Sequence, residues 1–261
     1  MLRQVTTPDG VRIAYEVSGE GPPLVLVHGA GSARWSFDTV RPHLEPRFTV
    51  MAIDRRGRGD SGDAVTYAVE DEYRDVVAVM REAGEDAFLF GHSYGGLVAA
   101  GAAAMLDGLP RLMLYEPAVG GRLAPPEVID RWEQLVASGE REQMVREFLR
   151  DTGGYTQEEI EAVRAGPTWA GRLDAAPSAI RELRAELAFR LDRQSLGEIA
   201  APTLLLLGTE SPDWAHRSIE AYSGALRDAT VHMLEGHGHG ALVSGPELVA
   251  SEIDGFLLSV G

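Results

Sequence analysis

Two residue types that carry much of the covalent chemistry of enzymes are missing from this sequence. It has no cysteine, which excludes disulfides, thiolate zinc sites and cysteine nucleophiles. It also has no lysine, because all 24 basic side chains are arginine. The absence of lysine excludes a Schiff-base lysine and a phosphate-binding P-loop lysine. Any covalent catalysis must therefore use another side chain.

Positive charge and long apolar runs are scarce as well. The 24 basic residues face 40 acidic ones, for a net charge of −16. Nucleic-acid binding needs a basic surface, so we expect no nucleic-acid partner. No apolar run reaches the ~18 residues of a membrane span. Residues 1–6 also lack the charged-then-apolar pattern of a signal peptide. We therefore expect a cytoplasmic protein without a membrane partner.

Short apolar runs alternate with helical patterns along the 261 residues. The turn Pro8-Asp9-Gly10 predicts an antiparallel hairpin whose second strand is Val11–Val17. Six further strands are predicted at Leu24–Val27, Phe48–Ile53, Phe88–Phe90, Leu112–Tyr115, Thr203–Leu207 and Thr230–Leu234. Helical patterns separate them, at positions such as Tyr73–Ala83, Tyr94–Leu106 and Ser218–Leu226. The alternation predicts an α/β fold, with a mostly parallel eight-stranded sheet and helices on both faces.

Residues 120–197 differ from the rest of the chain. They are rich in Arg and Glu, contain no strand-like run, and are divided by Pro and Gly pairs and by Pro177. Helical periodicity covers Val128–Ala137, Glu140–Leu149 and Ala179–Leu191. Because the segment is short, we expect no core of its own. We predict a helical lid inserted after the sixth strand, on a main domain formed by residues 1–119 and 198–261.

The sequence around Ser93 predicts a catalytic nucleophile. Residues 91–95 read Gly-His-Ser-Tyr-Gly, a G-x-S-x-G motif between a predicted strand and an Ala-rich helix. That context is what a nucleophile elbow requires. The sharp turn crowds the positions two residues on either side of the serine, so only glycine fits at 91 and 95. Ser93 then stands at a helix N-terminus, where partial positive charge favours a developing oxyanion.

Two further motifs extend this observation. Residues 26–31 read Leu-Val-His-Gly-Ala-Gly, and residues 54–61 read Asp-Arg-Arg-Gly-Arg-Gly-Asp-Ser. The second is similar to the D-x-R-G-x-G-x-S turn of the α/β-hydrolases. With the elbow, these motifs make the sequence resemble the serine-nucleophile, esterase-like branch of that superfamily, over about residues 11–117 and 197–258. In the family this turn is structural, so Asp54 is expected to be a turn and ion-pair residue.

The resemblance also implies an oxyanion hole. Acyl transfer needs two donors at the position of the tetrahedral oxygen. By resemblance these are the backbone N–H groups of Tyr94, after the nucleophile, and Ala30, after His-Gly. Gly29 and Gly31 would let that backbone turn inward, whereas His28 is expected to brace the loop.

A serine needs a base to take its proton, and histidine suits that task near neutral pH. Residues 236–240 read Gly-His-Gly-His-Gly after the last predicted strand. Family members carry the base here, seven residues before a proline that opens the final helix. His239 lies seven residues before Pro246, whereas His237 lies nine before it. We therefore predict His239 as the base. A His cluster also occurs in metal sites, but no third ligand set is evident, so we expect no metal.

The orienting acid departs from the commonest family pattern. The family usually places an Asp at the fourth position of a turn after the seventh strand, where this sequence has Ser211. We predict Glu116, at the end of the sixth strand and 23 residues after Ser93, as the acid. Some haloalkane dehalogenases, which share the fold, carry their acid at this strand end. Asp213 is the main alternative and Glu210 a weaker one.

Bulky side chains are candidates for the pocket wall. They are Trp35, Trp132, Trp169, Phe189 and Trp214, and we expect about two of them to line the site. The lid usually sets substrate choice in this fold, so specificity stays open. The arginines of the lid are matched by a comparable number of Glu residues, which favours solvated ion pairing over an anion site.

The predicted function is a cofactor-independent serine hydrolase that cleaves an ester, lactone or thioester through an acyl-enzyme on Ser93. Ser rather than Asp at the elbow disfavours epoxide hydrolysis and dehalogenation. Carbon–carbon bond hydrolysis and cofactor-free perhydrolysis use the same triad and stay open. A non-catalytic ligand-binding protein on the hydrolase scaffold is the alternative from another class, favoured by the missing Asp at 211. We expect a small-molecule substrate and a monomer or homodimer.

Overall fold

The computed structural model describes residues 1–120 and 124–258. Within them, eight strands form one sheet in the order β1-β2-β4-β3-β5-β6-β7-β8. The strands are β1 Leu2–Thr6, β2 Arg12–Ser18, β3 Pro23–Val27, β4 Thr49–Ile53, β5 Phe88–His92, β6 Leu112–Tyr115, β7 Thr203–Gly208 and β8 Ala229–Leu234. Only β1 with β2 and β2 with β4 pair antiparallel, and the other neighbours are parallel. The predicted α/β fold and mostly parallel sheet are confirmed.

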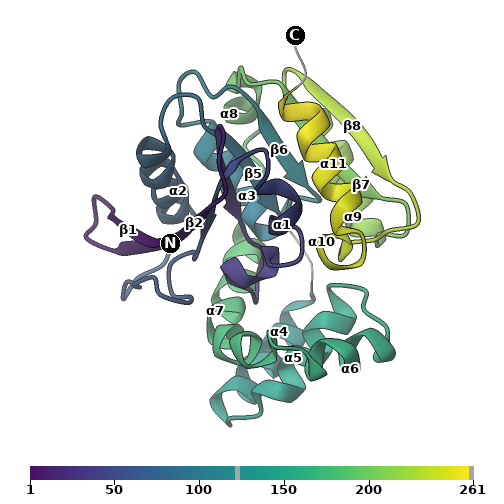
Figure 1. Cartoon of the computed structure of the whole chain (residues 1–261). Coiled ribbons are helices and arrows are strands. Elements are labelled where there is room, and N and C mark those ends of the chain that lie inside the picture. The colour runs from purple at the N-terminus through teal and green to yellow at the C-terminus, as the bar shows by residue number, and fades with distance from the viewer. Residues whose placement is uncertain (121–123, 259–261) are drawn as a thin grey trace.

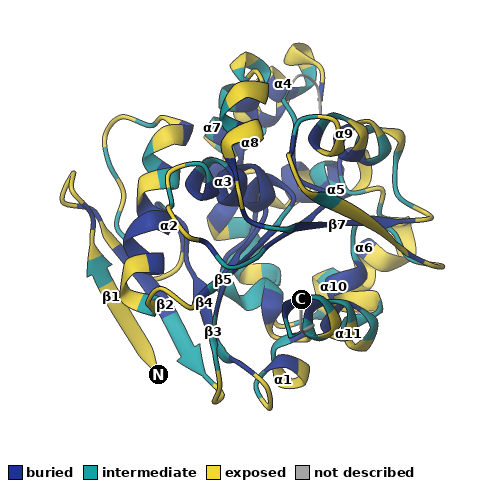
Figure 2. Ribbon diagram, turned by 90° about the horizontal axis from the view of Figure 1, so that it is seen from above, coloured by how far each residue is buried: buried dark blue, intermediate teal, exposed yellow. Residues whose placement is uncertain are grey.

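Helices cover both faces of this sheet, as the view from above in Figure 2 shows. One face packs against α2 Val69–Ala83, α3 Tyr94–Ala103, α8 Arg193–Glu198 and α9 Asp213–Ser223. The other packs against the 3-10 helix η1 Arg34–Phe37 and the helices α1 Arg41–Leu44, α10 Ala241–Ser244 and α11 Pro246–Leu257. The central strands are buried on both sides, which explains their near-continuous apolar runs.

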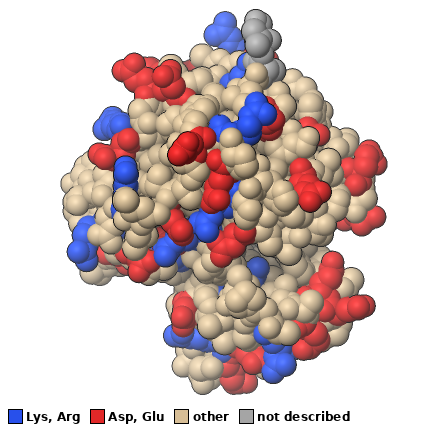
Figure 3. All heavy atoms as spheres, viewed as in Figure 1, with Lys and Arg blue, Asp and Glu red and all other residues tan. Residues whose placement is uncertain are grey.

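Between β6 and β7 the chain forms a separate group of helices, which we call the insertion. It consists of α4 Pro126–Ala137, α5 Arg141–Asp151, α6 Gln157–Ala165 and α7 Trp169–Ala188. Figure 1 shows α4, α5 and α6 below the sheet domain, with α7 running back toward it. In Figure 3 the surface is indented where the two parts meet, and acidic side chains are spread over both.

Two expectations about the insertion were wrong. The first was that the segment has no core of its own. Its helices in fact share a hydrophobic cluster that includes Trp132, Ile160 and Leu183, and Trp132 is fully buried. A short segment achieves this because each helix contributes one apolar face to a common centre. Pro177 does not divide the segment either, since it lies inside the 20-residue α7. Its ring is exposed, so water can solvate the carbonyl that loses a hydrogen bond.

Buried ion pairs fasten α7 to the sheet domain. Arg55 and Arg58 lie in the turn after β4, and both contact the carboxylate of Glu182 on α7. Arg55 Nε also lies 2.7 Å from Oε2 of Glu72 on α2, and all four side chains are at most 1% exposed. Removing one partner of such a buried group costs about 3–5 kcal/mol, so this cluster fixes the insertion to the core.

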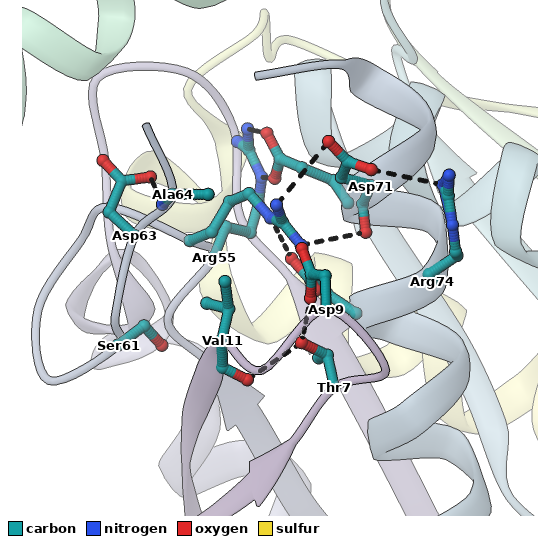
Figure 4. A network of polar contacts seen from close by, with 12 residues as sticks. Thr7, Asp9, Val11, Arg55, Ser61, Asp63, Ala64, Asp71 and Arg74 are labelled. Carbon is teal, nitrogen blue, oxygen red and sulfur yellow. Dashed lines mark hydrogen bonds and ion pairs between the residues drawn. The ribbon is translucent and has the colours of Figure 1, made fainter. Parts of the chain in front are cut away.

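Arg56, in the same turn, is the centre of a second network of ion pairs nearer the surface. Its guanidinium lies 2.7 Å from Asp75 on α2 and 3.1 Å from Asp9 of the first hairpin turn. Figure 4 shows Asp9, Asp71 and neighbouring side chains gathered there. Asp54 accepts backbone hydrogen bonds of 3.0 Å from residues 34 and 60, which confirms it as a turn and ion-pair residue.

In the described part of the chain, no helix has both the length and the apolarity needed to cross a bilayer.

Candidate active site

Ser93 lies in a strained turn between β5 and α3. Its backbone has φ 56° and ψ −126°, a conformation that side-chain-bearing residues rarely adopt. A Cβ at Gly91 would lie 2.5 Å from the Gly95 carbonyl oxygen, and one at Gly95 would lie 2.3 Å from that of His28. Both glycines are therefore required sterically, as the motif predicts. The turn places Ser93 at the N-terminus of α3, on the wall of a cavity.

His239 and Glu116 form a short hydrogen bond. Nδ1 of His239 lies 2.6 Å from Oε2 of Glu116, and the carboxylate is fully buried. His239 lines the same cavity as Ser93. Because a carboxylate accepts only, Nδ1 carries the hydrogen and leaves Nε2 unprotonated in the neutral ring. The three residues predicted as nucleophile, base and acid are thus assembled at the carboxyl ends of β5, β6 and β8.

The other oxygen of Glu116 receives two donors. The backbone N–H of Gly208 donates over 2.8 Å, and the hydroxyl of Ser211 donates to the same oxygen. Glu116 itself has φ 42°, so the strand end is strained to aim this side chain. Asp213 and Glu210 are both exposed, and neither contacts His239 among the hydrogen bonds of the described residues. The structure therefore brings Glu116, and not the two alternatives, to His239.

Aromatic rings hold His239 in place. The rings of His92 and Trp214 lie 4.5 and 4.8 Å from it, centroid to centroid. Nε2 of His92 donates a 3.1 Å hydrogen bond to the His239 carbonyl. Burial, and secondarily the electrostatic effect of the neighbouring His239 ring, keeps the pKa of His92 well below its usual value, so His92 stays neutral.

Tyr115 fixes the loop that carries the base. Its hydroxyl donates to the carbonyl of Gly238 and accepts a 3.2 Å hydrogen bond from the Ala241 N–H. Sequence reasoning missed this role, and it missed those of His92 and Ser211. The sequence did offer one indication of these roles: Tyr115 and His92 directly precede predicted site residues, and Ser211 occupies the position of the usual acid.

The neighbouring histidines take other roles. Nδ1 of His237 is 3.0 Å from the hydroxyl of Ser244. His28 is fully buried and braces its loop: it bonds to the Gly29 carbonyl over 2.9 Å and accepts from the Arg55 N–H over 3.1 Å. Burial, and then the charge of Arg55, keeps the pKa of His28 well below its usual value. The loop-bracing role expected for His28 is confirmed.

The loop that follows β3 lies against the elbow. A Cβ at Gly29 would stand 3.0 Å from Cβ of Ser93, so glycine permits this close approach. Ala30 lines the cavity beside Ser93, and its N–H donates no hydrogen bond to any described residue. Tyr94 is the first residue of α3, a position whose N–H has no partner inside a helix. Both predicted oxyanion donors are thus unengaged.

The cavity has a volume of about 380 Å³ and lies between the sheet domain and the insertion. The sheet domain contributes Ser93, His239, Trp35 and Trp214, while the insertion contributes residues such as Phe148. Of the five bulky candidates, Trp35 and Trp214 line it. Trp132 and Trp169 belong to the insertion cluster instead, and Phe189 packs on the main core. Apart from Arg172 and Asp38, the lining side chains are uncharged or histidine.

Within residues 1–120 and 124–258, no group of three or more His, Asp or Glu side chains could hold a metal ion.

Comparison with known proteins agrees with this architecture. A model of the alpha/beta hydrolase family matches residues 24–252. A crystal structure of an alpha/beta hydrolase from Sphaerobacter thermophilus is 32% identical, with a TM-score of 0.83 over 97% of this chain and 99% of that chain.

Two curated proteins also resemble the chain. A 2-(acetamidomethylene)succinate hydrolase from Mesorhizobium japonicum is 27% identical over 92% of this chain and 89% of its own length. A soluble epoxide hydrolase from a Corynebacterium is 38% identical over 35% of this chain and 32% of its own length. With the family match spanning most of its length, the chain belongs to the alpha/beta hydrolase family.

Proposed function

We propose that this protein is a serine hydrolase that cleaves a carboxylic ester, lactone or thioester through an acyl-enzyme on Ser93. The observation that carries the proposal is the 2.6 Å hydrogen bond between His239 Nδ1 and the buried Glu116 carboxylate, on the cavity that Ser93 also lines. A carboxylate in that position holds the imidazole with Nε2 free to accept a proton, which is what a serine nucleophile requires.

The first half-reaction builds the acyl-enzyme. Oγ of Ser93 attacks the carbonyl carbon while Nε2 of His239 takes its proton. The negative oxygen of the tetrahedral intermediate accepts hydrogen bonds from the N–H groups of Ala30 and Tyr94, aided by the N-terminal end of α3. His239 then gives its proton to the leaving alkoxide or thiolate, which departs as the alcohol or thiol.

The second half-reaction releases the acid. A water molecule loses a proton to His239 and attacks the acyl carbon, and Ser93 leaves with that proton restored. Glu116 stabilises the imidazolium in both halves. The insertion, α4 to α7, acts as the lid in this proposal, because it supplies one wall of the cavity and limits access of water.

Other reactions of this family remain candidates. Carbon–carbon bond hydrolysis and cofactor-free perhydrolysis use the same three residues, and they differ only in substrate. Epoxide opening by the family uses a carboxylate nucleophile, whereas position 93 is serine, so the local similarity to an epoxide hydrolase does not transfer that reaction. A ligand-binding protein without turnover is disfavoured by the strained elbow and the fully assembled Glu116–His239 pair.

A screen of 4-nitrophenyl acyl esters tests the proposal, with Ser93→Ala as the control. We expect turnover by the wild type and a loss of at least about a thousandfold in kcat for Ser93→Ala. Turnover that is equal in both proteins contradicts the mechanism. A wild type that is inactive on esters, lactones and thioesters alike, while it binds such ligands, favours the non-catalytic alternative.

A further inference from the structure

One cationic side chain lines the cavity and has no counterion among the described residues. Arg172 lies in the first turn of α7 and lines the cavity that Ser93 and His239 line from the opposite, sheet side. Its guanidinium carbon sits 4.9 Å from the centroid of the Trp35 ring. The insertion therefore contributes a positive charge to a site whose other walls are mostly apolar.

Arg172 differs from every other arginine of α4 to α7. The others all form ion pairs with carboxylates: Arg131, Arg141, Arg146, Arg150, Arg164, Arg181 and Arg184. Arg172 forms no ion pair with a described residue, and its Nε is buried without a hydrogen-bond partner among them. The solvated pairing expected from composition thus explains the other arginines of these helices and fails for this one.

The one acidic residue on the cavity wall does not neutralise Arg172. Asp38 is exposed, and its carboxylate lies 3.5 Å from the guanidinium of Arg41. Burial lowers the pKa of Arg172, but a guanidinium still holds its proton at neutral pH. The side chain is only partly exposed, and its Nε is buried without a hydrogen-bond partner among the described residues. Such a cation is costly to keep unpaired, so an anion that enters this cavity gains a partner for which no described carboxylate competes.

The contact with Trp35 also fits a binding role. A Cβ on the neighbouring Gly171 would lie 2.7 Å from Nε1 of the indole, so glycine leaves room for the ring against α7. Stacking on an aromatic face orients the guanidinium and leaves its edge N–H groups available, the geometry that suits a bidentate carboxylate. A single guanidinium matches one singly charged carboxylate, whereas a phosphate dianion would bring a second charge to a wall with no second arginine.

We propose that Arg172 binds a carboxylate of the substrate, so that the enzyme acts on monoesters of dicarboxylic acids, with the ester at Ser93 and the free acid at Arg172. This inference rests on the proposed function and specifies its substrate class. The apolar wall between the two ends accommodates the hydrocarbon chain that joins them.

Matched ester pairs provide the kinetic test. Monomethyl esters of straight-chain dicarboxylic acids, from succinate to suberate, are compared with methyl esters of monocarboxylic acids of equal length. We expect the wild type to prefer at least one acidic ester by about tenfold or more in kcat/KM. Arg172→Gln should remove that preference, and Arg172→Lys should keep part of it because it keeps the charge but loses the fork.

Arg164→Gln is the matched control, since Arg164 is exposed in the same insertion and pairs with Glu142 2.8 Å away. It should leave the preference unchanged. A wild type that prefers the neutral esters at every length overturns the proposal. So does an Arg172→Gln variant, folded by circular dichroism, that loses equal activity on both members of a pair.

A binding experiment separates this inference from the proposed function. Monomethyl adipate is titrated calorimetrically into Ser93→Ala and into Ser93→Ala/Arg172→Gln. We expect a Kd about tenfold or more higher in the double variant. If no ester is hydrolysed but this difference is found, the proposed hydrolysis fails and the carboxylate site stands. If the two Kd values are equal, or neither variant binds, the carboxylate site is overturned even where ester hydrolysis is observed.

Discussion

At the scale of single residues, the end of β6 is built around one carboxylate. Glu116 receives the Gly208 N–H and the Ser211 hydroxyl on one oxygen and the His239 ring on the other. Ser211 stands where the resemblance to the family places an acid. The Ser211 hydroxyl donates a hydrogen bond to Glu116, whose carboxylate comes from the end of the neighbouring strand β6. Glu116 thus supplies the carboxylate that the family usually places at position 211.

This arrangement predicts a loss and a rescue. Glu116→Gln should lower kcat by about 10³–10⁴-fold, because an amide can neither stabilise the imidazolium nor select the tautomer. Adding Ser211→Asp to that variant should restore at least about tenfold, since the new carboxylate lies against the same site. Steady-state kinetics on a 4-nitrophenyl ester measures both.

Asp213→Asn, at an exposed residue, should change kcat by less than about twofold. The opposite ranking of Glu116 and Asp213 contradicts our assignment.

The hydroxyl of Tyr115 should matter for activity more than for stability. Tyr115→Phe removes the hydrogen bonds to Gly238 and Ala241 and loosens the loop that carries His239. We expect kcat to fall about tenfold and the unfolding free energy to fall by about 1 kcal/mol. Tyr222→Phe is the control, because its buried hydroxyl donates over 2.9 Å to the Ala118 carbonyl, away from the base loop. It should cost similar stability and little activity, and an equal kcat loss in both variants argues against a specific role for Tyr115.

At the scale of elements, the β5–elbow–α3 unit depends on its glycines. A Cβ at Gly95 would stand 2.3 Å from the backbone oxygens of Val27 and His28. Gly95→Ala should therefore cost about 3 kcal/mol or more in unfolding free energy, measured by chemical denaturation. Gly255 is exposed on the solvent side of α11, and no atom lies within 4 Å of a Cβ built there. Gly255→Ala should stabilise the protein by about 0.5–1 kcal/mol. Equal effects at the two sites would refute the steric argument.

The elements that sequence reasoning predicted well are those specified locally. The strands before Ser93 and before Glu116 are short apolar runs, and Pro246 does begin α11. The core of the insertion was not predicted, because it arises from four helices that pack together, and no single helix shows it. The positions of Ser211 and Arg172 relative to the site were also missed, since both depend on contacts between distant segments. Candidate site residues could be named from the sequence because the chemistry of a serine hydrolase limits both residue type and spacing.

At the scale of the whole molecule, the junction between sheet and insertion contains a buried acid that forms no ion pair with a described residue. Glu186 on α7 is buried, and Oε2 has no hydrogen-bond partner among the described residues. Burial raises the pKa of its carboxyl to about 8. In the unfolded chain the pKa is near the usual 4.5. Between those values the folded state retains a proton that the unfolded state has lost.

Burial of Glu186 makes the unfolding free energy depend on pH. Since the folded protein binds more protons, its unfolding free energy decreases as the pH rises from about 5 to about 8. Glu186→Gln lacks this titration, so the wild type should lose a few kcal/mol relative to the variant over that range. Urea denaturation at a series of pH values measures the difference. A difference that is constant with pH shows that Glu186 is ionised in the folded protein.

Glu182 provides the contrast on the same helix. Its carboxylate is buried but contacts Arg55 and Arg58. Glu182→Gln should destabilise the protein by about 3–5 kcal/mol at neutral pH, because it leaves buried guanidinium groups without their partner. Stabilisation by Glu186→Gln and destabilisation by Glu182→Gln at pH 8 together test whether paired charge holds α7 on the sheet domain.

The central claim is that Ser93 is a nucleophile activated by His239, and fluorophosphonate labelling tests it most directly. The serine oxygen displaces fluoride and forms a stable phosphonyl ester, which intact-mass and peptide mass spectrometry detect. The account predicts one adduct per chain, on the peptide that contains Ser93, with none in Ser93→Ala and much slower labelling in His239→Ala. No adduct on the folded wild type, or an adduct that persists in Ser93→Ala, would contradict it.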